Sequence, residues 1–123
     1  MKRLLIVDDD PDILTLMSAL FRKNGFDVET ASRKEEALNK VVQFAPQVVL
    51  LDVLLSGSDG REFCRQIKDN VETKHIVVIM LSAHPVAAAQ IKNYGADDFL
   101  AKPIQIPTLI EVVCNYMEKA TQR

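Results

Sequence analysis

Uninterrupted apolar runs alternate with amphipathic stretches along this sequence. Such runs occur at residues 4–7, 48–51 and 76–81. A strand that is apolar at every position is buried on both faces, as in a parallel sheet covered by helices. These runs therefore predict interior strands of such a sheet. Residues 26–31 alternate apolar and polar instead, which is typical of an edge strand, and residues 98–101 predict a further short strand.

Helix signals fill the gaps between the predicted strands. Asp10 precedes Pro11 as an N-cap, and Asn24-Gly25 closes the helix that follows. Ser32 and Glu35 have the spacing of a capping box, which predicts the start of a second helix. Pro46 stops that second helix.

Three later segments complete the series of helices. A short helix carries Phe63, Cys64 and Ile67, an alanine-rich helix covers residues 86–94, and a last helix starts at Pro107. Apolar spacing predicts the inward faces of the first, second and last helices: Ile13, Met17, Leu20 and Phe21; Ala37, Leu38, Val41 and Val42; Leu109, Val112, Val113, Tyr116 and Met117. Five strands alternating with five helices predict an α/β fold: a parallel sheet with right-handed crossovers and helices on both faces.

Polar residues stand at the carboxyl ends of four of these strands. They are Asp8, Asp9, Asp52, Ser82 and Lys102. In a parallel sheet all carboxyl ends lie on one edge, and ligands bind in the crevice at that edge. We therefore expect these side chains to converge into one site, although each alone is compatible with a helix cap or a surface turn.

Carboxylates that converge at one site repel one another, so nearby positive charge must offset the repulsion. Two carboxylates about 4 Å apart repel by roughly 4 kcal/mol at an effective dielectric constant near 20, so three sum to about 12 kcal/mol. Lys102 offsets part of this repulsion, and a bound Mg²⁺ offsets it more completely, because Mg²⁺ prefers a few hard oxygen ligands and a substrate phosphate. A carboxylate nucleophile at Asp52, a hydroxyl at Ser82 and an ammonium at Lys102 are the groups needed to accept a phosphoryl group.

Composition narrows the classes of function. The net charge of −2 gives no electrostatic footprint for nucleic acid and no polybasic membrane anchor. No apolar run is long enough to span a bilayer or to act as a signal peptide. Cys64 and Cys114 are expected to be free thiols of a cytoplasmic protein.

The combined motifs resemble those of response-regulator receiver domains of two-component signalling, which are CheY-like. The resemblance covers essentially all of residues 1–123 and rests on Ile6-Val7-Asp8-Asp9, Leu51-Asp52, Asp59-Gly60, Leu81-Ser82-Ala83, Gly95-Ala96-Asp97-Asp98-Phe99 and Lys102-Pro103. It implies one receiver domain over 1–123 with a doubly wound, flavodoxin-like (βα)5 fold and strand order 2-1-3-4-5.

The resemblance also implies the role of each site residue. Asp52 is the phosphoacceptor, which takes its phosphoryl group from the phosphohistidine of a sensor kinase or phosphotransfer protein. Mg²⁺ is held by Asp8, Asp9, Asp52 and the backbone carbonyl of Leu54. Lys102 contacts the phosphoryl oxygens, and its peptide bond to Pro103 is commonly cis. Ser82 is the switch hydroxyl, and Phe99 is the switch aromatic.

Several positions depart from the family pattern. Leu55-Ser56 replaces the usual Met-Pro, and the segment from Ser82 to Gly95 is shorter than usual. Leu54 and His84 flank the phosphoryl group and tune its hydrolysis. Leu54 offers no polar group to orient a water, which predicts a long-lived aspartyl phosphate. His84 either donates to the phosphoryl group or faces solvent.

Other functions remain open on the residues alone. A flavodoxin-type small-molecule module needs a phosphate-cradling loop where this chain has Asp8-Asp9-Asp10-Pro11. A Mg²⁺-dependent phosphohydrolase needs a second acid and a lid, and a receiver-like adaptor would lack the complete acidic set. We expect a signalling phosphoacceptor rather than an enzyme. It acts on a protein target or through an output domain beyond this segment, it contacts neither nucleic acid nor membrane, and the sequence leaves open a homodimer that forms on phosphorylation.

Overall fold

Five parallel strands form the central sheet of a computed structural model that describes residues 2–55, 58–83, 94–103 and 105–121. The strands are β1 (Arg3–Val7), β2 (Asp27–Ala31), β3 (Val48–Asp52), β6 (Val77–Ser82) and β7 (Asp98–Ala101). Their spatial order is β2-β1-β3-β6-β7, and every adjacent pair is parallel. The predicted doubly wound α/β fold with strand order 2-1-3-4-5 is confirmed.

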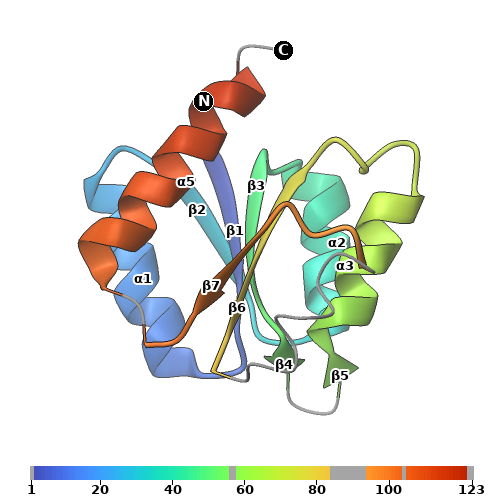
Figure 1. Ribbon diagram of the computed structural model, residues 1–123, viewed down its shortest axis with the longest axis horizontal. Coiled ribbons are helices and arrows are strands. Elements are labelled where there is room, and N and C mark those ends of the chain that lie inside the picture. The colour runs from blue at the N-terminus through green and yellow to red at the C-terminus, as the bar shows by residue number, and fades with distance from the viewer. Residues whose placement is uncertain (1, 56–57, 84–93, 104, 122–123) are drawn as a thin grey trace.

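Helices cover both faces of this sheet (Figure 1). On one face lie α1 (Pro11–Lys23) and α5 (Ile106–Thr121), and on the other lie α2 (Lys34–Phe44) and α3 (Gly60–Asp69). Successive strand residues alternate between the two cores. Leu4 and Ile6 pack with α1 and α5, whereas Leu5 and Val7 pack with α2 and α3. This double burial is the reason why the interior strands are apolar at every position.

The first helix starts and ends as predicted. The Asp10 side chain accepts hydrogen bonds from the N–H groups of Asp12 and Ile13, and Pro11 occupies the first helical position. Gly25 follows the helix with a φ of 89°, a backbone conformation that glycine adopts without a steric penalty.

The prediction of a capping box at the start of the second helix is wrong. The N-cap is Arg33, which makes no side-chain capping bond, and the Ser32 N–H donates to Glu36 Oε1 at 2.8 Å rather than to Glu35. The helix ends at Phe44 before Pro46, as predicted. Val42 is not inward, because its side chain is 74% exposed.

Two other elements differ from the prediction, and a third lies almost wholly outside the described residues. The loop after β3 contains a short antiparallel pair, β4 (Leu54–Leu55) and β5 (Ser58–Asp59). The last helix starts at Ile106, one residue before Pro107. Of the helix predicted over 86–94, only Tyr94 lies within the described residues.

The described ranges contain no helix long and apolar enough to cross a membrane. Cys64 is buried, Cys114 is partly buried, and both are free thiols, as predicted. Burial raises the pKa of the Cys64 thiol to about 11.

Candidate functional site

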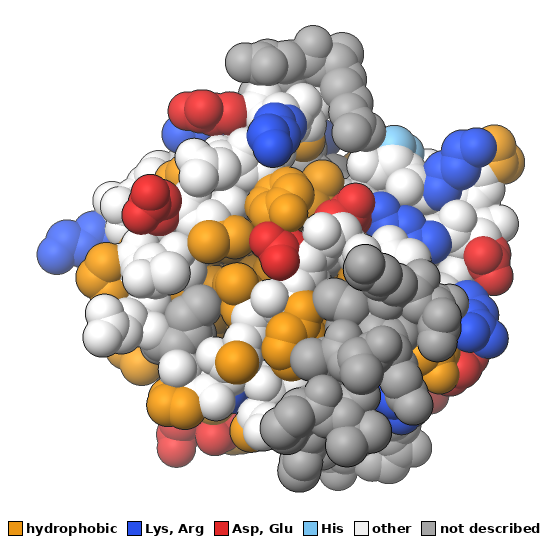
Figure 2. All heavy atoms as spheres, viewed as in Figure 1, with side chains coloured by type: hydrophobic (Ala, Val, Ile, Leu, Met, Phe, Trp, Pro, Cys, Tyr) orange, Lys and Arg blue, Asp and Glu red, His pale blue; other side chains and the backbone are white. Residues whose placement is uncertain are grey.

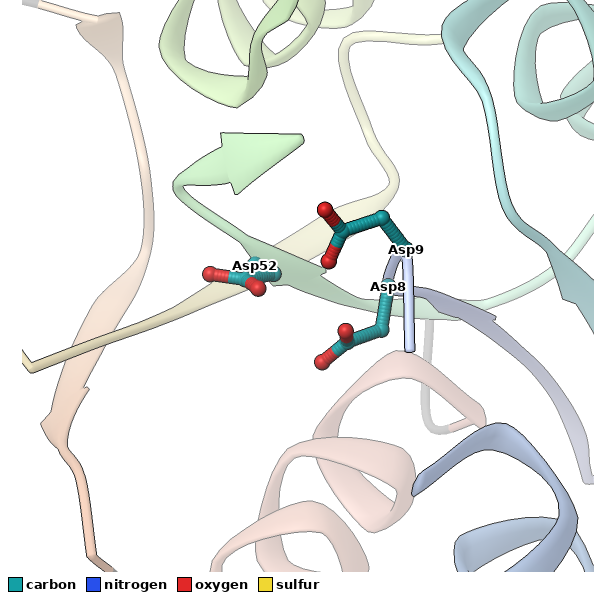
Figure 3. A group of neighbouring side chains, drawn as sticks. All are labelled: Asp8, Asp9 and Asp52. Atoms are coloured by element: carbon teal, nitrogen blue, oxygen red, sulfur yellow. The ribbon is translucent and has the colours of Figure 1, made fainter. Parts of the chain in front are cut away.

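Three carboxylates meet at the carboxyl ends of two neighbouring strands. Asp8 and Asp9 follow β1, and Asp52 ends β3, whose Leu51 pairs with Val7 of β1. One carboxylate oxygen from each aspartate lies within 4.8 Å of the other two. Figure 3 shows the three side chains around one shared space. The predicted convergence of these acids is therefore present in the fold.

The fold holds these acids at different depths. Asp8 is buried, Asp52 is partly buried and Asp9 is exposed. The backbone N–H of Asp8 donates to Ala31 O at 3.1 Å, and its Oδ1 accepts from the N–H of Asp10 at 3.0 Å. The Asp8-Asp9-Asp10 run is thus divided, because Asp10 caps α1 while its two predecessors belong to the acidic cluster.

Lys102 brings a positive charge to the same place. This residue follows β7, and its Nζ lies 3.4 Å from Asp8 Oδ2 and 3.4 Å from Asp52 Oδ2. The peptide bond between Lys102 and Pro103 is cis. One ammonium against three carboxylates leaves an excess of negative charge. Closely spaced hard oxygen donors with this excess suit a divalent cation of the Mg²⁺ type.

Comparison with known proteins assigns the family. The family model described as the response regulator receiver domain matches residues 4–114. The chain belongs to the response regulator receiver domain family. This receiver domain is 36% identical over 104 residues to the alkaline phosphatase synthesis transcriptional regulatory protein PhoP of Bacillus subtilis, covering 83% of this chain and 42% of PhoP. It is 29% identical over 120 residues to the phosphate regulon transcriptional regulatory protein PhoB of Rhizobium meliloti, covering 96% of this chain and 53% of PhoB.

Solved structures give the same result. The CheY-like response regulator receiver domain protein of Methanospirillum hungatei superimposes with a TM-score of 0.91 at 26% identity, covering 99% of this chain and 98% of that chain. The chain spans about half the length of the curated relatives it matches. It is a receiver domain of two-component signalling, and the comparisons give no support to a phosphohydrolase or a flavodoxin-type module.

The predicted switch residues lie on the two strands beyond β3. Ser82 ends β6 and is buried, and its backbone carbonyl accepts from the Lys102 N–H at 2.9 Å. On β3, Asp52 pairs with Leu81, the residue before Ser82. Phe99 on β7 is partly buried against the core beneath α2 and α3. The two predicted tuning positions are less fully placed: Leu54 contributes its backbone to β4, and His84 lies outside the described residues.

Gly60 is a site residue whose individual role sequence reasoning missed. Its N–H donates to Val53 O at 2.7 Å, and a Cβ built on it would lie 2.3 Å from the Asp52 carbonyl oxygen. Any side chain here would collide with the backbone of the residue at the centre of the site. The Asp59-Gly60 pair was the available signal, but nothing local in the sequence says which backbone the glycine approaches.

An apolar pocket also borders the acidic cluster. Its volume is about 440 Å³, and it lies between α1, the end of β6 and the start of α5, with Asp8 and Lys102 in its wall. Leu16 in the same wall is 55% exposed. Figure 2 shows hydrophobic side chains gathered over α5 and β7 on the viewed face.

Proposed function

We propose that Asp52 accepts a phosphoryl group from the phosphohistidine of a sensor kinase or phosphotransfer protein. A bond forms between an Asp52 carboxylate oxygen and phosphorus, the phosphorus–nitrogen bond breaks, and the imidazole leaves with that electron pair. The observation that supports this assignment is the packing of three carboxylates within 4.8 Å, beside an ammonium 3.4 Å from two of them.

The surrounding residues have separate roles. Asp8, Asp9, Asp52 and the backbone carbonyl of Leu54 would hold Mg²⁺, which when bound neutralises carboxylate and phosphoryl oxygens. Lys102 pairs with the incoming phosphoryl oxygens, and its present pairing with Asp52 supports this role. Ser82 donates its hydroxyl to the phosphoryl group, and Phe99 moves further into the core when Ser82 turns. The new charge is thereby converted into a changed protein surface.

The partners follow from this chemistry. The donor protein must reach Asp52 beside the apolar pocket, where the exposed side chain of Leu16 offers a contact for an apolar helix. The changed surface acts on a protein target or on an output domain, because PhoP and PhoB extend well beyond the matched segment. We assign to this segment no enzymatic turnover beyond its own phosphorylation and dephosphorylation, and no contact with nucleic acid.

The test of this proposal uses a small phosphodonor. We expect the purified chain to gain the mass of one phosphoryl group when it is incubated with acetyl phosphate and Mg²⁺, as read by intact mass spectrometry. Excess EDTA should abolish the gain, because the carboxylates then repel the donor. A chain that stays unmodified at excess donor and Mg²⁺ would overturn the proposal.

The side chain at position 54 is expected to set the lifetime of the aspartyl phosphate. An amide at this position could orient a water toward phosphorus, whereas leucine cannot. Leu54→Asn should therefore shorten the lifetime about tenfold or more, a small part of the range that a positioned general base supplies. The measurement is loss of the phosphoryl mass after the donor is removed, with Leu54→Met as the control. An equal lifetime in the Asn and Met variants would count against this role.

A further inference from the structure

One side of α3 holds the segment that leads into β7. Arg61, Cys64, Arg65 and Lys68 are spaced as one stripe along the helix. The Arg65 guanidinium lies 4.5 Å from the centre of the Tyr94 ring, and that of Arg61 lies 5.5 Å from it. Cys64 Sγ donates to the carbonyl oxygen of Tyr94 at 3.3 Å. We call these contacts, together with those of Lys68 described next, the α3 clamp.

Lys68 makes the strongest contact of the α3 clamp. Its Nζ lies 2.7 Å from Asp97 Oδ2, and it also donates to the Ile76 carbonyl at 2.6 Å. Asp97 is bound twice more, because its Oδ2 accepts from the Val78 N–H and its own N–H donates to Val78 O, each at 2.8 Å. The side chain of Lys68 is 16% exposed and that of Asp97 is 35% exposed, so solvent screens this charged pair in part. The entrance of β7 is therefore fixed to α3 and β6 together.

The same helix starts at the phosphoacceptor. Gly60, the first residue of α3, packs its Cα against the Asp52 carbonyl and donates its N–H to Val53 O. At the far end of β7, Lys102 pairs with Asp52. A single helix of 10 residues thus connects the strand that carries the phosphoacceptor with the start of the strand that leads to its lysine.

We propose that the α3 clamp stabilises the unphosphorylated arrangement and that phosphorylation of Asp52 loosens it. This inference rests on the function proposed above. A phosphoryl group adds between one and two negative charges and several acceptor oxygens, which draw Lys102 toward phosphorus. Because β7 has only four residues and is hydrogen-bonded to β6 on one side, a pull on Lys102 reaches its other end. The contacts of Lys68 with Asp97 resist that displacement.

Coupling of this kind is reciprocal. If occupancy of Asp52 weakens the α3 clamp, then weakening the α3 clamp must favour occupancy of Asp52 by the same factor. Lys68→Met keeps the aliphatic stem that lies beside Gly95 but removes the ammonium, and Asp97→Asn keeps the shape of the carboxylate but removes its charge. Lys74→Met is the matched control, because it removes an exposed ammonium from the neighbouring loop.

The experiment titrates each full chain with beryllofluoride and Mg²⁺, followed by fluorine NMR; beryllofluoride on a carboxylate stands in for the phosphoryl group. We expect Lys68→Met and Asp97→Asn each to bind about threefold tighter or more, and Lys74→Met to bind as the unsubstituted chain does. Unchanged or weaker binding in both variants would overturn the inference. If the unsubstituted chain binds no beryllofluoride, the proposed function itself fails, and the two failures are thereby distinguished.

A second measurement reads the α3 clamp directly. In a Cys114→Ser background, Cys64 is the only thiol of the chain. In the unphosphorylated protein it is buried, and its Sγ donates a hydrogen bond to Tyr94 O. Beryllofluoride should raise the rate at which iodoacetamide modifies Cys64 by about threefold or more, because loosening exposes the buried thiol to the reagent. Equal rates with and without bound beryllofluoride would contradict loosening of the α3 clamp.

Discussion

Asp52→Asn is expected to gain no phosphoryl mass from acetyl phosphate and Mg²⁺. A carboxylate oxygen is the nucleophile in the proposed step, and an amide oxygen is too weak a nucleophile to replace it. The substitution is nearly isosteric and removes one charge from a crowded acidic cluster, so the fold should persist. Loss of uptake would then reflect the lost nucleophile rather than unfolding. Intact mass spectrometry measures the uptake, and circular dichroism checks the fold.

The matched control for this experiment is Asp27→Asn. Asp27 is an exposed aspartate at the amino end of β2, whereas Asp52 lies at the carboxyl end of β3, and all strands of the sheet are parallel. It should be phosphorylated as rapidly as the unsubstituted chain. Uptake by Asp52→Asn at the rate of this control would show that another side chain is the acceptor, and peptide mapping would identify it.

Asp9→Asn is expected to abolish most of the stabilisation that Mg²⁺ gives to the fold. A ligand that binds only the folded state at about 100 times its Kd stabilises that state by roughly 2.7 kcal/mol. For a domain of this size that free energy corresponds to an increase in Tm of about 10 °C. Removing one of three carboxylate ligands should reduce the increase to about 3 °C or less at the same Mg²⁺ concentration.

The sign of the effect without metal gives a second check. Asp9 repels Asp8 and Asp52, so without Mg²⁺ the Asp9→Asn chain should be at least as stable as the unsubstituted one. The gain should not exceed about 1 kcal/mol, because Asp9 is exposed and solvent screens its charge. Thermal unfolding with and without Mg²⁺ measures both quantities, and Asp27→Asn again serves as the control. An Asp9→Asn chain that responds to Mg²⁺ as fully as the control would remove Asp9 from the proposed ligand set.

The acidic cluster could be predicted because its residues are placed by topology. Asp8, Asp52 and Lys102 each lie at the carboxyl end of a strand, and parallel strands bring such positions to one edge of the sheet whatever the details of packing. The interior strands could also be predicted from the sequence, since burial on both faces leaves a continuous apolar run. The strand order was not predicted from the residues, because alternation of strands and helices does not rank neighbours within the sheet. It came from the family resemblance.

Contacts between side chains far apart in the chain could not be predicted from the sequence. Lys68 and Asp97 are 29 positions apart, and although Asp97 belongs to a motif of the family, nothing in the sequence pairs it with Lys68. The same holds for Gly60, whose approach to the Asp52 carbonyl depends on how the loop folds back. The start of α2 was predicted less exactly, since the Ser32 N–H donates to Glu36 and not, as expected, to Glu35. One turn of helix offers both glutamates, and only the exact start of α2 selects between them.

The position of Gly60 also limits how the loop after Asp52 can vary between proteins. The loop leaves β3 and must return to the carbonyls of Asp52 and Val53, where Gly60 completes it by donating its N–H to Val53 O. Closure depends on backbone atoms and on the spacing between the two ends, so an insertion or deletion in this loop should disturb the fold more than a change of side chain does. We therefore expect related chains to vary here in composition more than in length, as Leu55-Ser56 in place of the usual Met-Pro illustrates.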